Sequence, residues 1–116
     1  KGYLMIESPP TTFEKSVQYL IDNIPECDKL YISKMKLKPD NLRKLDKGEH
    51  LLIELHHTLG KCIRNTFGLW SNANPPLVKE LSKKMRETKN MEYHADDASS
   101  LIIKELWNRL KEIYSE

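Results

Sequence analysis

The sequence predicts an all-α protein, a compact, soluble, single-domain bundle of four or five helices. Apolar residues recur at intervals of three and four in several separate stretches, and no stretch alternates in the way that is typical of a strand. The chain has 116 residues, of which 39% are hydrophobic and 31% are charged. This length and composition are sufficient to bury a core without disulfides or metals. The longest apolar stretch is too short to predict a membrane-spanning helix.

We expect residues 1–10 to form an extended lead-in and residues 11–116 to form a single helical domain. Thr11 and Glu14 have the spacing of a capping box, which predicts that the first helix begins at Thr11. A helical apolar stripe follows, consisting of Phe13, Val17, Leu20, Ile21 and Ile24. Pro25 ends this helix because proline cannot donate a backbone hydrogen bond.

Two shorter apolar patterns come next. The first, between Leu30 and Pro39, indicates either a second helix or a turn-rich connector. The second, with Asp40 placed to cap it, indicates a short helical segment that reaches Leu45. Both patterns are too short for periodicity to decide between these alternatives.

A central helix is predicted near residues 48–67, with Asp46 and Glu49 at capping-box spacing. One apolar stripe consists of Leu52, Leu55, Leu59, Cys62 and Ile63, and a second row beside it consists of Ile53, His57, Gly60 and Arg64. Because a surface helix usually has one buried stripe, two adjacent stripes predict a helix that is contacted on two sides. Gly68 is suited to the left-handed conformation that often ends a helix.

Two further helices are predicted after a loop from Leu69 to Pro76. The first has prolines at its start and carries Leu77, Val78, Leu81 and Met85. Residues 87–95 are polar and are predicted to be a loop. Asp96 or Asp97 is expected to cap the last helix. Its central stripe consists of Ile102, Leu106, Leu110 and Ile113, and Ile103, Trp107 and Tyr114 widen the apolar face, which predicts a well-buried helix.

Unusual polar and aromatic residues gather in segment 56–70. The candidate binding residues there and at the start of the last helix are His56, His57, Arg64, Asn65, Trp70, Asp96 and Asp97. His57 and Arg64 are seven residues apart and therefore share a helix face. In a binding site, Arg64 and Asn65 would hold an anion or a carboxylate, a histidine would transfer a proton, and Trp70 would form a wall.

The same residues also fit a structural clasp. Arg64 would then pair with Asp96 or Asp97, Asn65 would hydrogen-bond to loop backbone around Gly68, and Trp70 would plug the end of the bundle. We favour the clasp over the site, because partly buried Arg–Asp pairs often do no more than fix geometry.

Patterns that would support catalysis, a metal or a cofactor are missing from the sequence. His94, Asp96 and Asp97 lack the spacing of known metal sites. Ser99 and Ser100 do not form a nucleophile elbow, and no glycine-rich phosphate loop or dinucleotide fingerprint is present. We therefore predict no catalytic residue, no metal and no cofactor. The only two cysteines are Cys27 and Cys62, and whether they pair is left open.

Charge gives a weak indication of partners. The chain has 19 basic and 17 acidic side chains and a net charge of +2. Basic residues gather in runs 29–47 and 79–89. Solvated lysines on helix surfaces are the preferred explanation, which makes nucleic-acid binding the minority alternative.

The motifs H-x-x-L-G-x-x-I-R-N-x-F-G-L-W at 56–70 and D-D-A-S-x-x-I-I-x-x-L-W at 96–107 resemble an uncharacterised bacterial family of small helical proteins, a domain of unknown function. The opening T-F-E-x-x-V-x-x-L at 12–20 is similar to the same family. The resemblance implies a bacterial source and implies no activity. It also implies that the candidate residues in these motifs act together, namely His56, Arg64, Asn65, Trp70, Asp96 and Asp97.

Our leading functional hypothesis is a non-enzymatic interaction or regulatory module that presents the Arg64, Asn65 and Trp70 region to another protein. The first alternative is a small-molecule or enzymatic site that uses His57, Arg64, Asn65 and Asp97, and the second is nucleic-acid binding through the two basic runs. Because the chain begins with Lys1, we expect that a preceding segment was removed. A cytoplasmic protein is favoured over an exported one, and the oligomeric state is left open.

Overall fold

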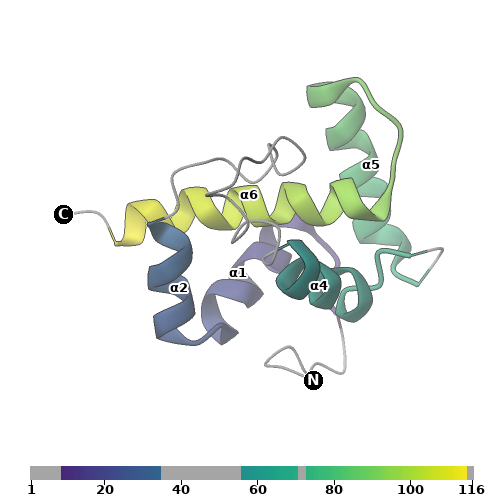
Figure 1. Ribbon diagram of the computed structural model, residues 1–116. Helices are drawn as coiled ribbons and strands as arrows, with labels where there is room; N and C mark the ends of the chain where they lie inside the picture. Colours follow the sequence, from purple (N-terminus) through teal and green to yellow (C-terminus); the bar gives the residue numbers. More distant parts are fainter. Residues whose placement is uncertain (1–8, 35–55, 71–72, 115–116) are drawn as a thin grey trace.

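The computed structural model describes residues 9–34, 56–70 and 73–114. These segments contain five α-helices, one π-helical turn and no strand (Figure 1), which confirms the predicted all-α bundle. In chain order the elements are α1 (Phe13–Asn23), α2 (Glu26–Ser33), η3 (His56–Gly60), α4 (Lys61–Thr66), α5 (Pro75–Lys89) and α6 (Ala95–Ile113). No helix in this part of the chain is long and apolar enough to cross a membrane.

Helix α6 is the element that all the others contact. In Figure 1 it runs across the molecule, with α1, α2 and α4 along one side and α5 crossing near its N-terminal end. The described part of the predicted central helix near residues 48–67 consists of η3 and α4, which also pack against α6. Residues 48–55 lie outside the described part, as do the lead-in residues 1–8 and the predicted short segment that follows Asp40.

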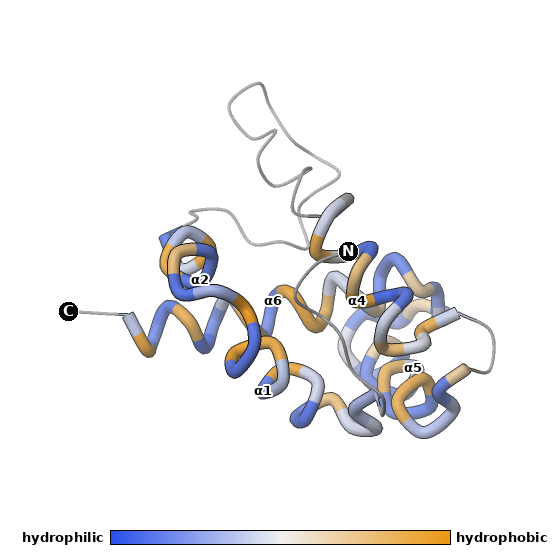
Figure 2. Tube along the Cα trace, turned by 90° about the horizontal axis from the view of Figure 1, so that it is seen from below, coloured by the Kyte–Doolittle hydropathy of each residue, from blue (hydrophilic) through white to orange (hydrophobic). Residues whose placement is uncertain are grey.

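The core is built from one apolar face of each helix, and Figure 2 shows these faces alternating with polar ones along the tube. Its buried hydrophobic residues are Val17, Leu20, Ile24, Ile32, Leu59, Ile63, Phe67, Leu69, Leu77, Leu81, Met85, Ala95, Ala98, Ile102, Ile103, Leu106, Trp107 and Leu110. Full burial of each large member contributes about 1.5–3 kcal/mol. The predicted stripe of α6 is therefore correct as far as Leu110, but Ile113 is 56% exposed because it lies in the last turn of the helix.

Helix α1 begins one residue later than the sequence predicted. Thr12, not Thr11, is the N-cap, and its hydroxyl accepts a hydrogen bond from the Lys15 N–H at 3.0 Å. The side chain of Glu80 on α5 accepts a second one from the Phe13 N–H at 2.9 Å. With Thr12 as the N-cap, Glu14 lies one residue before the capping-box position, and its carboxylate pairs with Arg109 instead.

A tight corner joins α1 to α2. Ile24 leaves the helical conformation and Pro25 is the N-cap of α2. The Lys29 ammonium group then donates to the carbonyl of Ile21 near the end of α1, at 2.9 Å. Leu30 and Ile32 thus belong to a helix that is already formed at Glu26, and residues 35–39 of this pattern lie outside the described part.

The helix formed by η3 and α4 is continuous, because Gly60 keeps helical backbone angles where the π turn changes to α. Its end is the predicted one: Gly68 has a φ of +68°, and the Leu69 N–H donates to the Arg64 carbonyl at 2.9 Å. This is the bond that closes a Schellman motif. A Cβ atom at position 68 would lie 3.1 Å from the Cβ atoms of Ala73 and Asn74, so the lack of a side chain at Gly68 lets these two residues pack closely against it.

The connection between α5 and α6 is shorter than predicted. Helix α5 continues to Lys89, and the left-handed residue Asn90, with a φ of +51°, ends it. Only residues 90–94 remain outside the two helices, in place of the predicted loop 87–95. This short connection holds the N-terminal end of α6 close to α5.

Candidate functional site at the N-terminal end of helix α6

Two loops meet at the N-terminal end of α6. The hydroxyl of Tyr93, just before α6, donates to the carbonyl of Leu69, just after α4, at 2.6 Å. Burial raises the pKa of Tyr93 to about 12. This hydrogen bond joins the two segments that carry most of the predicted site residues.

Arg64 lies beneath these loops and is only 8% exposed. Its Nη1 donates to the Ser99 hydroxyl at 2.9 Å, and its Nε lies 3.3 Å from Oδ1 of Asp96. The Ser99 hydroxyl in turn donates to the Asp96 carbonyl at 2.9 Å. We call Arg64, Asp96 and Ser99 the buried clasp. The sequence suggested Asp96 or Asp97 as the partner of Arg64, and in the structure Arg64 pairs with Asp96.

The N-cap of α6 is His94, and the prediction that Asp96 or Asp97 caps this helix was wrong. Nδ1 of His94 accepts the Asp96 N–H at 3.0 Å, and the His94 backbone is extended as an N-cap requires. Both aspartates lie in the first turn of the helix, where a negative charge suits the helix dipole. The Asp96 side chain is therefore available to Arg64.

Trp70 projects from the loop after α4 and is 46% exposed, so it does not plug the end of the bundle as predicted. Its indole Nε1 donates to Oδ1 of Asn65 at 3.2 Å. Its ring also meets the ring of His94 edge-on, with centroids 6.1 Å apart. Asn65 consequently orients an aromatic side chain, and among the described residues it makes no hydrogen bond to the loop backbone near Gly68. We call Trp70, Asn65 and His94 the Trp70 face.

Asn74 performs the loop-bracing role that was expected of Asn65. It is 4% exposed, and its Nδ2 donates to the carbonyls of Phe67 at 2.8 Å and Pro10 at 2.9 Å. No role was predicted for Asn74, which lies in the loop from Leu69 to Pro76. Its position just before a helix was a usable signal, because a polar residue there is usually engaged with nearby backbone.

The side chains of His56 and His57 lie outside the described part, so their suggested roles remain predictions. Within the described segments, no group of three His, Cys, Asp or Glu side chains could hold a metal ion. Cys27 is exposed and Cys62 is half-buried, and both are free thiols.

The geometry divides the cluster into two layers with different chemistry. In the buried clasp, Arg64 already binds a carboxylate and a hydroxyl, so it is not open to a substrate anion. In the Trp70 face, an indole ring, an amide and an imidazole are accessible from solvent. The outer layer is suited to contact with another molecule, and the inner layer is suited to holding the outer one in place.

Comparison with known proteins agrees with the resemblance noted in the sequence. Residues 9–110 match the family described as Domain of unknown function (DUF6794). A search of curated proteins and a search of solved structures each found no match. The matched range contains α1, α2, η3, α4 and α5 completely, and both layers of the cluster. The chain therefore belongs to the DUF6794 family, a domain of unknown function.

Proposed function

We propose that the protein is a binding module that uses the Trp70 face to contact another protein. The observation that carries this proposal is that Trp70 is 46% exposed and is nevertheless held by a hydrogen bond to Asn65 and by the edge of the His94 ring. A side chain that is ordered before binding loses less conformational entropy when the complex forms.

The composition of the Trp70 face supports this role. Tryptophan is among the residues that contribute most to binding energy at protein interfaces, where polar groups surround the central contact. Asn65 and His94 supply such polar groups beside the ring. The buried clasp beneath them would keep the loop after α4 and the start of α6 in fixed relative positions.

The alternative of a small-molecule or enzymatic site at His57, Arg64, Asn65 and Asp97 has less support. Arg64 would have to leave Asp96 and Ser99 before it could bind a substrate, and separating a buried guanidinium group from its partners is costly. Nucleic-acid binding also has less support, because 19 basic and 17 acidic side chains leave a net charge of only +2.

Affinity capture from the native cells with parent and variant proteins as bait tests the proposal. Trp70→Ala should reduce recovery of the specific partner at least tenfold, since loss of a central tryptophan commonly costs about 2–4 kcal/mol of binding energy. Ile113→Ala is the matched control, because Ile113 is also a large exposed apolar residue and lies at the other end of α6. Equal recovery of every captured protein by a folded Trp70→Ala variant and by the parent would refute the proposal.

A further inference from the structure

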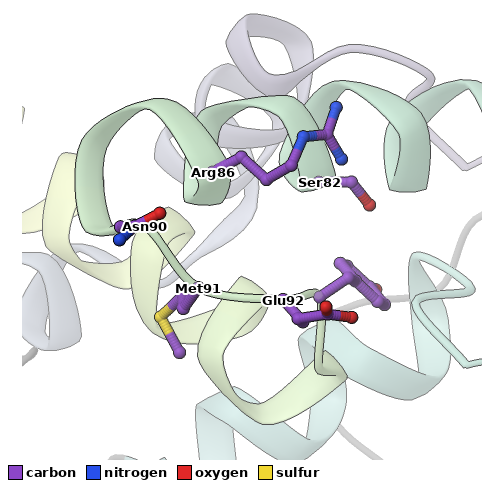
Figure 3. Close-up of a pocket in the computed structure, with 6 residues that line it drawn as sticks. Ser82, Arg86, Asn90, Met91 and Glu92 are labelled. Carbon is purple, nitrogen blue, oxygen red and sulfur yellow. The ribbon is translucent and has the colours of Figure 1, made fainter.

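An open hollow lies between the C-terminal half of α5 and the connection that leads to α6 (Figure 3). It has a volume of about 410 Å³ and is lined by Ser82, Arg86, Asn90, Met91, Glu92 and Tyr93. This volume is within the range of sites that bind small molecules, roughly 300–1,000 Å³. None of these residues belongs to the Trp70 face or to the buried clasp.

The two walls of the hollow carry opposite charges. Ser82 and Arg86 come from α5 on one wall, and Glu92 comes from the connection on the other (Figure 3). Within the described part of the chain, neither Arg86 nor Glu92 forms an ion pair or a hydrogen bond through its side chain. A guanidinium group and a carboxylate thus line one small space without neutralising each other.

The wall formed by the connection is held in place by backbone and side-chain bonds. The Met91 N–H donates to the Met85 carbonyl at 3.3 Å. The left-handed conformation of Asn90 turns the chain back toward α5 so that this bond can form. Tyr93 is anchored by its hydrogen bond to Leu69. The half-buried side chains of Met91 and Tyr93 give this wall an apolar surface beside Glu92.

We propose that this hollow is a binding site for a free α-amino acid. The Arg86 guanidinium group and the Ser82 hydroxyl would hold the carboxylate, and the Glu92 carboxylate would hold the ammonium group. A planar guanidinium group matches a carboxylate with two parallel hydrogen bonds. The side chain of the amino acid would rest on Met91 and Tyr93, since a thioether and an aromatic ring offer adaptable apolar contact. This inference does not depend on the function proposed for the Trp70 face.

Binding can be tested by recording backbone amide NMR spectra of the protein with each of the protein-forming L-amino acids in turn. A ligand concentration of about 10 mM is sufficient, because a few polar contacts in an open site give a Kd near 1 mM. At least one amino acid should shift the amide signals of Ser82, Arg86 and residues 90–93. If no amino acid shifts them, the proposal is wrong.

Charge variants and analogues of the best ligand then test the assignment of each wall. Arg86→Gln and Glu92→Gln should each weaken binding roughly tenfold or more, because a charged hydrogen-bond partner is lost. Lys79→Gln on the same helix is the charge-matched control and should not change the affinity. Glu92→Gln should have no effect on the analogue that lacks the amine, and Arg86→Gln should have no effect on the analogue that lacks the carboxylate. If neither Arg86→Gln nor Glu92→Gln changes the affinity, the assignment of the two walls is wrong. Trp70→Ala should leave amino-acid binding unchanged.

Discussion

The two ends of α6 are each joined to the rest of the bundle by an arginine, but in different surroundings. Near the N-terminal end, Arg64 of α4 is 8% exposed and binds Asp96 and Ser99. Near the C-terminal end, Arg109 of α6 binds Glu14 of α1 at 2.6 Å and Glu105 of its own helix at 3.0 Å. The Glu14 side chain is 70% exposed.

The difference shows that a short contact distance does not identify the more important pair. The Arg109–Glu14 contact is the shorter one, and its hydrogen bond lowers the pKa of Glu14 and raises the pKa of Arg109. Water can replace either partner of this exposed pair, so each contributes little to stability. If Asp96 were removed, water could not reach Arg64 as easily, and a buried charge would lose its partner.

The largest effect is expected from the buried clasp. Arg64→Ala should lower the free energy of unfolding by about 3 kcal/mol. This is the lower end of the range for a broken buried ion pair, because the Asp96 side chain is 37% exposed. Asp96→Ala and the double variant complete a thermodynamic cycle, measured by denaturant melts. The two losses should not add, since the residues are in contact. Additive losses would mean that the two side chains contribute independently.

A smaller effect is expected from Tyr93, which joins the loops above the clasp. Tyr93→Phe removes one partly buried hydrogen bond, which should cost about 1 kcal/mol. Burial raises the pKa of Tyr93 from 10 to about 12, so the parent loses stability as the pH rises from 10 toward 12, whereas phenylalanine does not ionise. Melts between pH 8 and 12 should therefore show the variant and the parent converging as the pH rises. A constant difference across this range would contradict the assignment.

Arg109→Ala at the exposed end should have a smaller effect than either change at the buried end, and added salt should reduce it further. The lowered pKa of Glu14 stabilises the fold above the ordinary value of 4.5, and this contribution disappears as the pH falls below that value. Melts at neutral pH and near pH 3 should show a smaller difference between variant and parent at the lower pH. A loss as large as that of Arg64→Ala would break the comparison between the two ends.

The smallest effect on stability is expected from Trp70→Ala. A half-exposed side chain contributes little to the core, so the free energy of unfolding should change by no more than about 0.5 kcal/mol. Trp107→Phe is a useful contrast, because Trp107 is 4% exposed and its loss should leave a cavity. A large destabilisation by Trp70→Ala would mean that Trp70 serves the fold and would remove the main support for a binding role.

Periodicity predicted the helices well, because burial of one face leaves a regular spacing in the sequence. It predicted their ends less well. At the start of α1 the sequence favoured Thr11, which has Glu14 at capping-box spacing, but Thr12 is the N-cap, and the Phe13 N–H is bonded to Glu80, which is distant in the sequence. At the start of α6 two aspartates were more typical caps than His94, but His94 is the N-cap and the Asp96 side chain pairs with Arg64, which is distant in the sequence.

The site was predicted as a group of residues, and the contacts within the group were predicted only in part. Spacing placed Arg64, Asn65 and Trp70 in one segment and made Asp96 a candidate partner. It did not reveal that Ser99 completes the clasp or that Asn65 holds the indole. The Arg109–Glu14 contact joins residues 95 positions apart, and no local pattern could indicate it.

Gly68 and Asn90 both have left-handed backbones, yet they set different limits on how the sequence of this fold can vary. At position 90 an asparagine already occupies the left-handed conformation, and glycine would fit there without steric conflict. At position 68 any other residue would need a positive φ, which side chains disfavour. Its Cβ atom would also lie only 3.1 Å from the Cβ atoms of Ala73 and Asn74. A side chain at position 68 would therefore be strained and would require the chain at Ala73 and Asn74 to move away by a few tenths of an ångström, whereas position 90 has no such requirement.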